Sequence, residues 1–176
     1  MELETKYTRV EYERRFLVSP QADWWNAVEP YSKSFEDKYL QNSRLRLRIP
    51  TDSDTGRRVI KLTKKLESAS PYFQTIGRIL LSPGEYEIFD ALPGDRLRKI
   101  RHYHVHQGRV FSIDVFEGEL DGLILCETEA DGLEELMSIQ PPAYAGYEVT
   151  EDPFFTGGNL CRTSQAELLR KLSTFA

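Results

Sequence analysis

The chain has 176 residues, of which 40% are hydrophobic and 29% are charged. This length and composition predict one globular domain over residues 1–176 and exclude a disordered chain. The net charge of −5 argues against binding to nucleic acid through an overall basic surface. No apolar run approaches the ~20 residues of a membrane helix, so no membrane association is expected.

Two further features bear on the compartment. The cysteines, Cys126 and Cys161, are too few for a disulfide framework. The first nine residues are charged and lack the apolar stretch of a secretory signal. Both features predict a cytoplasmic protein. The sequence leaves open whether two copies form a homodimer.

Helix signals occur in three places along the chain, and a weaker one in a fourth. A serine followed by a proline predicts a helix over residues 20–29. Capping boxes, in which a serine is followed three residues later by a glutamate, predict helices that begin at Ser82 and Ser164. A fourth helix is expected over residues 131–138.

The remaining segments alternate polar and apolar residues with period two, which predicts strands. They span residues 7–18, 38–50, 57–66, 73–81, 97–106, 109–117, 123–130 and 146–150. Eight strands with short helices between them predict a closed eight-stranded antiparallel β-barrel, mainly β within the α+β class. An open α+β sheet with helices on one face is the alternative.

Several of these strands place charges on one face and apolar residues on the other, because strand side chains alternate. Residues 44–49 place three arginines together, residues 59–65 place two lysines together, and residues 10–16 combine two glutamates with an arginine. Any one such face could simply meet solvent. Several large patches of one sign repel themselves, however, unless they face one another inside a barrel and leave charge for a ligand.

A series of short motifs follows the same strands between about residues 11 and 160. Glu11, Glu13 and Arg15 resemble the E-x-E-x-K signature of the CYTH superfamily, the triphosphate tunnel metalloenzymes. Further matches, in the order of the family, lie at residues 39–40 with 45–49, 62–65, 99–103, 113–118, 122–129 and 146–150. The resemblance implies the same eight-stranded antiparallel tunnel that the alternation predicts.

The resemblance also implies roles for individual residues. The predicted substrate-binding residues are Tyr39, Arg46, Arg48, Lys61, Lys65, Arg78, Lys99 and Arg101. The predicted metal-binding residues are Glu11, Glu13, Asp114, Glu127, Glu129 and Glu148, and the metal would be Mg²⁺ or Mn²⁺. The predicted catalytic residues are Glu11, Glu13, Arg15 and Lys99. Hard cations prefer carboxylate and phosphate oxygens, and arginine forks match phosphate geometry, which supports this division.

The implied activity is metal-dependent hydrolysis of a linear triphosphate, with inorganic tripolyphosphate as the leading substrate. The same resemblance covers thiamine triphosphatases and class IV adenylyl cyclases, and a non-catalytic module that binds polyphosphate or nucleotide is a further alternative. Three positions depart from the family pattern. Arg15 replaces the signature lysine, while Ser112 and Leu80 stand where many members carry carboxylates. The number of metal ions therefore stays open.

Three alternating histidines are the other candidate metal ligands. His102, His104 and His106 lie on the face opposite Lys99 and Arg101, and hence outside the predicted tunnel. Histidines on one strand face can bind zinc. A strand face that is exposed or covered by a helix is the favoured interpretation.

Overall fold

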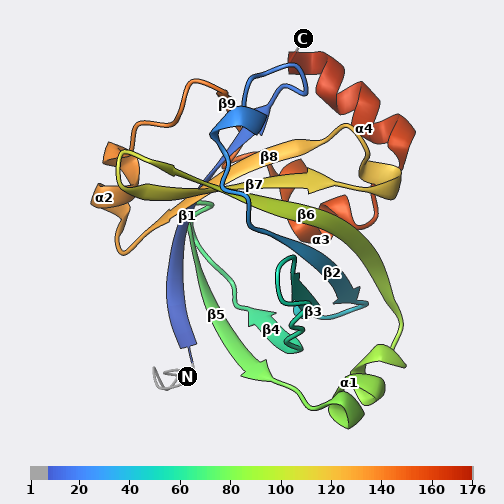
Figure 1. Ribbon diagram of the computed structural model, residues 1–176. Coiled ribbons are helices and arrows are strands. Elements are labelled where there is room, and N and C mark those ends of the chain that lie inside the picture. Colours follow the sequence, from blue (N-terminus) through green and yellow to red (C-terminus); the bar gives the residue numbers. More distant parts are fainter. Residues whose placement is uncertain (1–7, 176) are drawn as a thin grey trace.

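The computed structural model describes residues 8–175, and within that range nine strands form one antiparallel sheet (Figure 1). The strands are β1 (Thr8–Val18), β2 (Ser32–Leu40), β3 (Leu45–Asp52), β4 (Lys61–Lys65), β5 (Phe73–Leu80), β6 (Gly94–His106), β7 (Arg109–Phe116), β8 (Ile124–Ala130) and β9 (Ala145–Glu148). The α-helices are α1 (Pro83–Asp90), α2 (Leu133–Ser138), α3 (Gly157–Leu160) and α4 (Gln165–Leu172).

The sheet closes on itself through β1. Its order is β5-β4-β3-β2-β6-β7-β8-β1-β9, and β1 also pairs with β5. Residues Thr8–Tyr12 of β1 pair with β5, and residues Tyr12–Leu17 pair with β8. The predicted closed eight-stranded barrel is therefore confirmed, and the open sheet is excluded. The ninth strand, β9, pairs only with the end of β1.

The strand predicted over residues 38–50 is wrong, because it joins parts of two strands. β2 ends at Leu40, a polar turn follows, and β3 begins at Leu45. Asn42 has a φ of 54° in this turn, a conformation that asparagine tolerates better than most residues. β2 in turn begins at Ser32, which the sequence prediction missed. The first residue of the strand predicted over residues 7–18 lies outside the described residues.

The helix predicted over residues 20–29 is also wrong, since only a short 3₁₀ turn forms at Trp25–Ala27. The physical reason is that the segment is tied to the barrel instead. Trp24 is buried against the outer face, and the backbone N–H of Glu29 donates to the carbonyl of Tyr103 on β6. The other helices are confirmed as α1, α2 and α4, and both predicted capping boxes are present.

Apolar side chains pack outside the barrel and at one end of it. One cluster, which includes Phe111, Ile113 and Leu136, lies between the outer face of the sheet and α2. A second cluster brings residues of α3 and α4, such as Leu160 and Leu168, against the strand ends that they cover. The charged strand faces are thus left to line the interior. Among the described residues, no helix is long and apolar enough to cross a membrane.

Candidate active site in the tunnel

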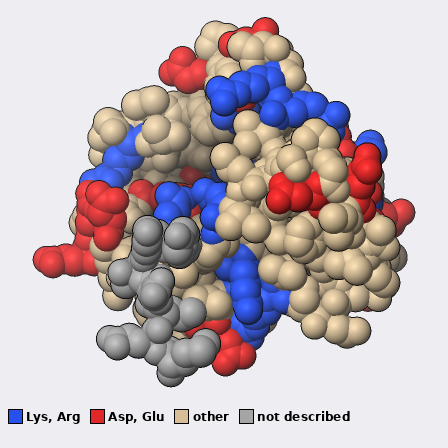
Figure 2. All heavy atoms as spheres, turned by 90° about the horizontal axis from the view of Figure 1, so that it is seen from below, with Lys and Arg blue, Asp and Glu red and all other residues tan. Residues whose placement is uncertain are grey.

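The barrel encloses a cavity of about 280 Å³ whose lining is dominated by charged side chains. Figure 2 shows Lys and Arg side chains gathered in a hollow on the face seen from below. The cavity is lined by all eight predicted substrate-binding residues, Tyr39, Arg46, Arg48, Lys61, Lys65, Arg78, Lys99 and Arg101. Glu11, Glu13, Arg15, Glu127 and Glu129 also line it. The strand alternation places these side chains inward.

On one wall, formed by β1, β6, β7 and β8, the charges are paired with one another. Arg15 donates from Nη2 to Glu13 at 2.7 Å and from Nε to Glu127 at 2.9 Å. Arg101 donates to Glu127 at 2.7 Å and makes two bonds of 2.6 Å to Asp114. We call this set, together with Lys99, the compensated wall, because each cation in it has a carboxylate partner.

Lys99 completes this network from β6 by pairing with Asp114. Burial lowers the pKa of Lys99 to about 8, although the carboxylate of Asp114 acts in the opposite direction. Burial alone would raise the pKa of Asp114 and Glu127, but the neighbouring cations outweigh it and lower both values. The two acids therefore stay ionised at neutral pH and hold the basic side chains in place.

On the facing wall, formed by β3 and β4, two buried polar atoms lack a hydrogen-bond partner among the described residues. Arg46 and Thr63 pair in register on these strands. Arg46 Nε and Thr63 Oγ1 are both buried, and neither has a hydrogen-bond partner within residues 8–175. Buried polar atoms are normally satisfied, so the exception at Arg46, which lines the cavity, indicates a missing polar ligand. We call Arg46, Thr63, Lys61 and Lys65 the open wall.

The two lysines of the open wall flank this pair. Burial is the largest influence that lowers the pKa of Lys61, and Arg78 and Lys33 add to it. Burial also lowers the pKa of Lys65, with Arg46 and Arg15 acting in the same direction and Glu13 against them. Ammonium groups that repel their neighbours in this way are ready to bind an anion.

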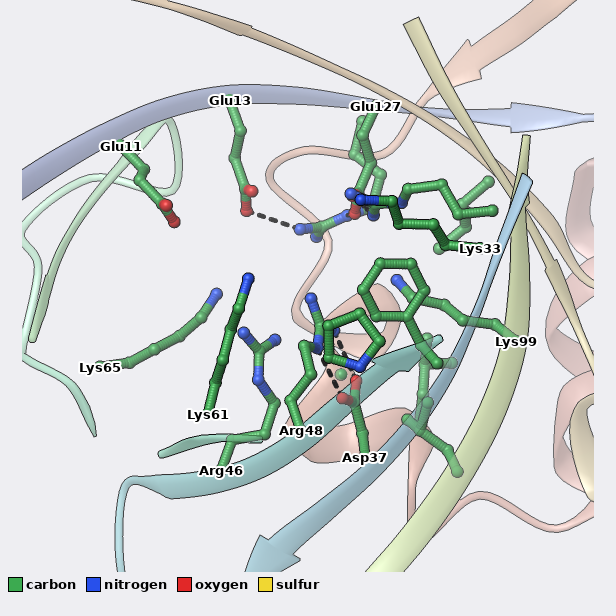
Figure 3. Close-up of a pocket in the computed structure, with 18 of the residues that line it drawn as sticks. Glu11, Glu13, Lys33, Asp37, Arg46, Arg48, Lys61, Lys65, Lys99 and Glu127 are labelled. Carbon is green, nitrogen blue, oxygen red and sulfur yellow. Dashed lines mark hydrogen bonds and ion pairs between the residues drawn. The ribbon is translucent and has the colours of Figure 1, made fainter. Parts of the chain in front are cut away.

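Three carboxylates face the open wall. Figure 3 shows Glu11 and Glu13 extending from β1 toward the ends of Lys61, Lys65 and Arg46. Glu129 on β8 pairs in register with Glu13. Burial, followed by the charges of Glu11 and Glu13, raises the pKa of Glu129. A cation bound between these carboxylates would offset the repulsion between their like charges.

The three carboxylates do not form a preformed metal cage. No group of three or more His, Cys, Asp or Glu residues among those described is close enough to hold an ion by itself. Mg²⁺ usually takes only one or two protein carboxylates and completes its shell with water and substrate phosphates. The arrangement therefore fits a metal that is held jointly with an anionic ligand.

The structure separates two predicted metal ligands from this group. Asp114 is fully buried, does not line the cavity, and has both oxygens occupied by Arg101. Glu148 lies on β9 outside the barrel and accepts hydrogen bonds from Arg14 at 2.7 and 3.1 Å and from Thr150 at 2.9 Å. Neither carboxylate is brought together with Glu11 and Glu13.

Sequence reasoning missed an acidic residue on the tunnel's inner face. Asp37 on β2 lines the cavity together with Phe35 and Tyr39. The signal for Asp37 was present, because residues 33, 35, 37 and 39 alternate toward one face. It was lost when the start of β2 was missed.

The histidines lie on the outer face of β6, as predicted. His102 packs against the rings of Trp24 and Trp25, and His104 Nδ1 lies 2.8 Å from the hydroxyl of Tyr144. Burial lowers the pKa of His104, and the nearby His106 acts in the same direction. These contacts are those of a covered strand face.

Comparison with known proteins assigns the fold to a family. No protein family model matches this sequence. The inorganic triphosphatase of Nitrosomonas europaea is 31% identical over 154 residues, which cover 81% of this chain and 90% of that protein. The chain belongs to the CYTH superfamily. The solved structure of an inorganic triphosphatase covers 87% of this chain and 95% of its own length, with 25% identity and a TM-score of 0.56.

A more distant solved structure shares the fold alone. It is a Hippeastrum protein with a dominant triphosphatase activity, which is 14% identical and has a TM-score of 0.51. It covers 73% of this chain and 82% of its own. The similarity to the inorganic triphosphatase of Nitrosomonas europaea confirms the superfamily that the strand motifs indicated.

Proposed function

We propose that this protein is a metal-dependent triphosphatase that hydrolyses inorganic tripolyphosphate in its tunnel. The observation that carries the proposal is the pair of buried, unpartnered polar atoms, Arg46 Nε and Thr63 Oγ1, beside Lys61 and Lys65 among the described residues. A phosphate chain in the cavity would supply acceptors to Arg46, Lys61 and Lys65, which all line it. The similarity to a protein named inorganic triphosphatase supports the same substrate.

The open wall would hold the phosphates. A guanidinium and two ammonium groups gain charge-assisted hydrogen bonds to phosphate oxygens, which are stronger than neutral ones. The negative chain would also favour the charged forms of Lys61 and Lys65, whose pKa values are lowered first by burial and then by neighbouring cations. Arg78, whose side chain is one-third exposed at the cavity rim, would meet one end of the chain.

Glu11, Glu13 and Glu129 would hold the metal. Mg²⁺ or Mn²⁺ would stabilise the charge that develops on the phosphoryl oxygens. We leave Asp114 and Glu148 out of this set, because arginines occupy both oxygens of each. In Glu11 and Glu13, arginines of the described range occupy Oε1 alone, and Oε2 remains for a metal. The two excluded acids are therefore proposed to act on protein side chains.

Arg15 would act as a fixed cation. It binds Glu13 and Glu127 with different nitrogens and so sets the direction of both carboxylates. An arginine keeps its proton at any working pH, since its pKa stays above about 12. The proton of the attacking water would go to a carboxylate and not to residue 15.

A product analysis tests the proposed function. The protein is incubated with tripolyphosphate, ATP or thiamine triphosphate, with and without Mg²⁺ or Mn²⁺. We expect phosphate release from tripolyphosphate only when metal is present. Pyrophosphate together with cyclic AMP from ATP would instead identify a cyclase, a preference for thiamine triphosphate would identify that hydrolase, and binding without turnover would identify a module.

We further propose that residues 1–176 act as one tunnel domain in a reducing cytoplasm. The barrel includes eight of the described strands, and α2, α3, α4 and β9 pack on it, which supports the first point. Cys126 and Cys161 are both free, which supports the second.

A further inference from the structure

One acidic side chain of the tunnel lies apart from the others. The other cavity carboxylates come from β1 and β8, whereas Asp37 comes from β2, beside the open wall. Asp37 pairs in register with Arg48 on β3. Its side chain is 1% exposed, and its two oxygens accept hydrogen bonds from Arg48 Nε at 2.6 Å and Nη2 at 2.5 Å. Figure 3 shows this fork.

Arg48 is held on a second side as well. Its guanidinium carbon lies 4.7 Å from the centre of the Phe35 ring. A guanidinium has five N–H donors, and the fork with Asp37 uses only two of them. The remaining donors, including both on Nη1, keep a fixed direction relative to the cavity that Arg48 lines.

The neighbouring arginine on the same face provides a contrast. Arg46 lies two residues earlier on β3, and its buried Nε has no partner within residues 8–175. Arg48 is therefore oriented by a carboxylate before any ligand arrives, while Arg46 Nε has no such partner in that range. Asp37 stays ionised at neutral pH, because the charges of Arg48 and Arg46 outweigh the effect of burial and lower its pKa to about 2.

We propose that Asp37 is a positioning residue, which orients Arg48 toward the phosphate chain without itself touching substrate or metal. The proposal rests on the triphosphatase function proposed above. Both oxygens of Asp37 are occupied by Arg48, and the surrounding groups are cations, so a metal ion has no place there. A preoriented donor stabilises charge that develops in the transition state without paying for reorganisation.

The orientation predicts a split between kcat and KM. Removing the charge of Asp37 makes the tunnel more positive, which strengthens the general attraction for tripolyphosphate. It also releases Arg48 from its fork, which weakens the directed contact in the transition state. Asp37→Asn should therefore lower kcat about tenfold without raising KM. This is less than the roughly hundredfold loss expected when an oriented donor is removed outright, because Arg48 stays in place and loses only its orientation.

A double-mutant cycle tests this. Arg48→Lys keeps the charge but cannot form the fork, so it should resemble Asp37→Asn, and the double variant should be no worse than either single one. Asp90→Asn is the matched control, because Asp90 pairs with Arg96 at 2.5 Å away from the cavity, and it should leave both constants unchanged. A rise in KM at constant kcat, or additive losses in the cycle, would overturn the proposal.

A second readout does not depend on turnover and so separates this proposal from the proposed function. In ¹H–¹⁵N spectra of the ligand-free protein, the Arg48 Nε–H signal, assigned by its loss in Arg48→Lys, should be protected from exchange. It should lose protection in Asp37→Asn. An unchanged Arg48 signal would refute the positioning role even if tripolyphosphate is not the substrate.

If Asp37→Asn fails to fold, a second pair of variants tests the proposal. In that case Arg48→Lys is compared with Arg46→Lys, since both keep the charge at neighbouring positions of β3. We expect Arg48→Lys to lower kcat and Arg46→Lys to raise KM. Equal effects on kcat would contradict the distinction between an oriented and an unoriented arginine.

Discussion

The two walls of the tunnel contain the same kinds of cationic side chain in opposite situations. Arg101 on the compensated wall binds two carboxylates, while Arg46 on the open wall has a buried nitrogen without a partner in the described range. Both line the cavity, and both belong to the basic set predicted from sequence. An arginine that points inward shows only that the tunnel is charged. Its hydrogen-bond partners decide whether it stabilises the protein or is available to bind a ligand.

The energetics of burial explain why both situations occur together. A buried ion pair contributes little net stability, but removal of one partner leaves a costly unpaired charge. The compensated wall should therefore be sensitive to loss of its acids. A cation without a partner costs stability in the free protein, and its retention fits a binding role. Variants on the open wall should then change binding more than folding.

The largest effect is expected on the compensated wall. Asp114→Ala would leave Lys99 and Arg101 without their shared partner, and we expect a loss of about 3–5 kcal/mol in the free energy of unfolding. Urea denaturation measures it. If Asp114 were instead a metal ligand, the variant would keep its metal-free stability and lose affinity for Mn²⁺.

On the open wall, Arg46→Met should weaken binding and leave folding intact. Loss of a charge-assisted contact should reduce tripolyphosphate affinity by about 1.5–3 kcal/mol, roughly tenfold to a hundredfold. The unfolding free energy without ligand should stay the same or rise, because an unsatisfied group is removed. Calorimetric titration and urea denaturation together check both parts. If Arg46→Met lost as much stability as Asp114→Ala, the two walls would not differ in the way proposed.

Two carboxylates on β8 sharpen the comparison through pH. Cations lower the pKa of Glu127, whereas burial and nearby acids raise that of Glu129. Glu127 therefore adds stability that is lost as the pH falls below about 4. Glu129 acts in the opposite direction, since its stabilising protonated form is lost as the pH rises past its folded-state pKa.

Carboxyl ¹³C titrations of the metal-free protein measure both groups directly. The signal of Glu127 should titrate below the usual glutamate value of about 4.3, and that of Glu129 above it. As a check on the sign, Glu129→Gln should stabilise the metal-free protein at neutral pH. Coincident titrations would mean that the two acids share one environment.

The smallest effect is expected at Thr63. Thr63→Val keeps the shape and removes the unpartnered hydroxyl, so the free protein should become slightly more stable. If the hydroxyl donates to a phosphate, tripolyphosphate binding should weaken by about 0.5–1.5 kcal/mol. Calorimetric titration detects a change of this size. Unchanged binding would mean that the Thr63 hydroxyl does not contact the phosphate chain.

The sequence predicted the barrel and most of the cavity lining because both depend on a local rule. Period-two alternation decides which side chains share a face, and the motifs decided that the charged faces point inward. Pairing across the tunnel is not local. The occupation of Asp114 by Arg101 requires two strands and their register, so its predicted metal role rested on resemblance alone.

Two errors in the predicted helices and strands had local causes. The helix expected over residues 20–29 had a good starting signal, but Trp24 gains more by packing on the barrel. The start of β2 was missed because charged residues alternate there without a regular apolar face. That omission removed Asp37, the only tunnel acid on β2 among the described residues, from the predicted site.

The most direct test of the account compares two adjacent lysines of β4. Lys65 lines the tunnel and Lys64 is exposed on the other face of the strand. Steady-state hydrolysis of tripolyphosphate with Mg²⁺ is measured for the wild type, Lys65→Met and Lys64→Met. The account predicts phosphate release by the wild type, an unchanged Lys64→Met, and a KM raised roughly tenfold or more in Lys65→Met. Equal KM values for the two variants, or no phosphate release by the wild type, would contradict it.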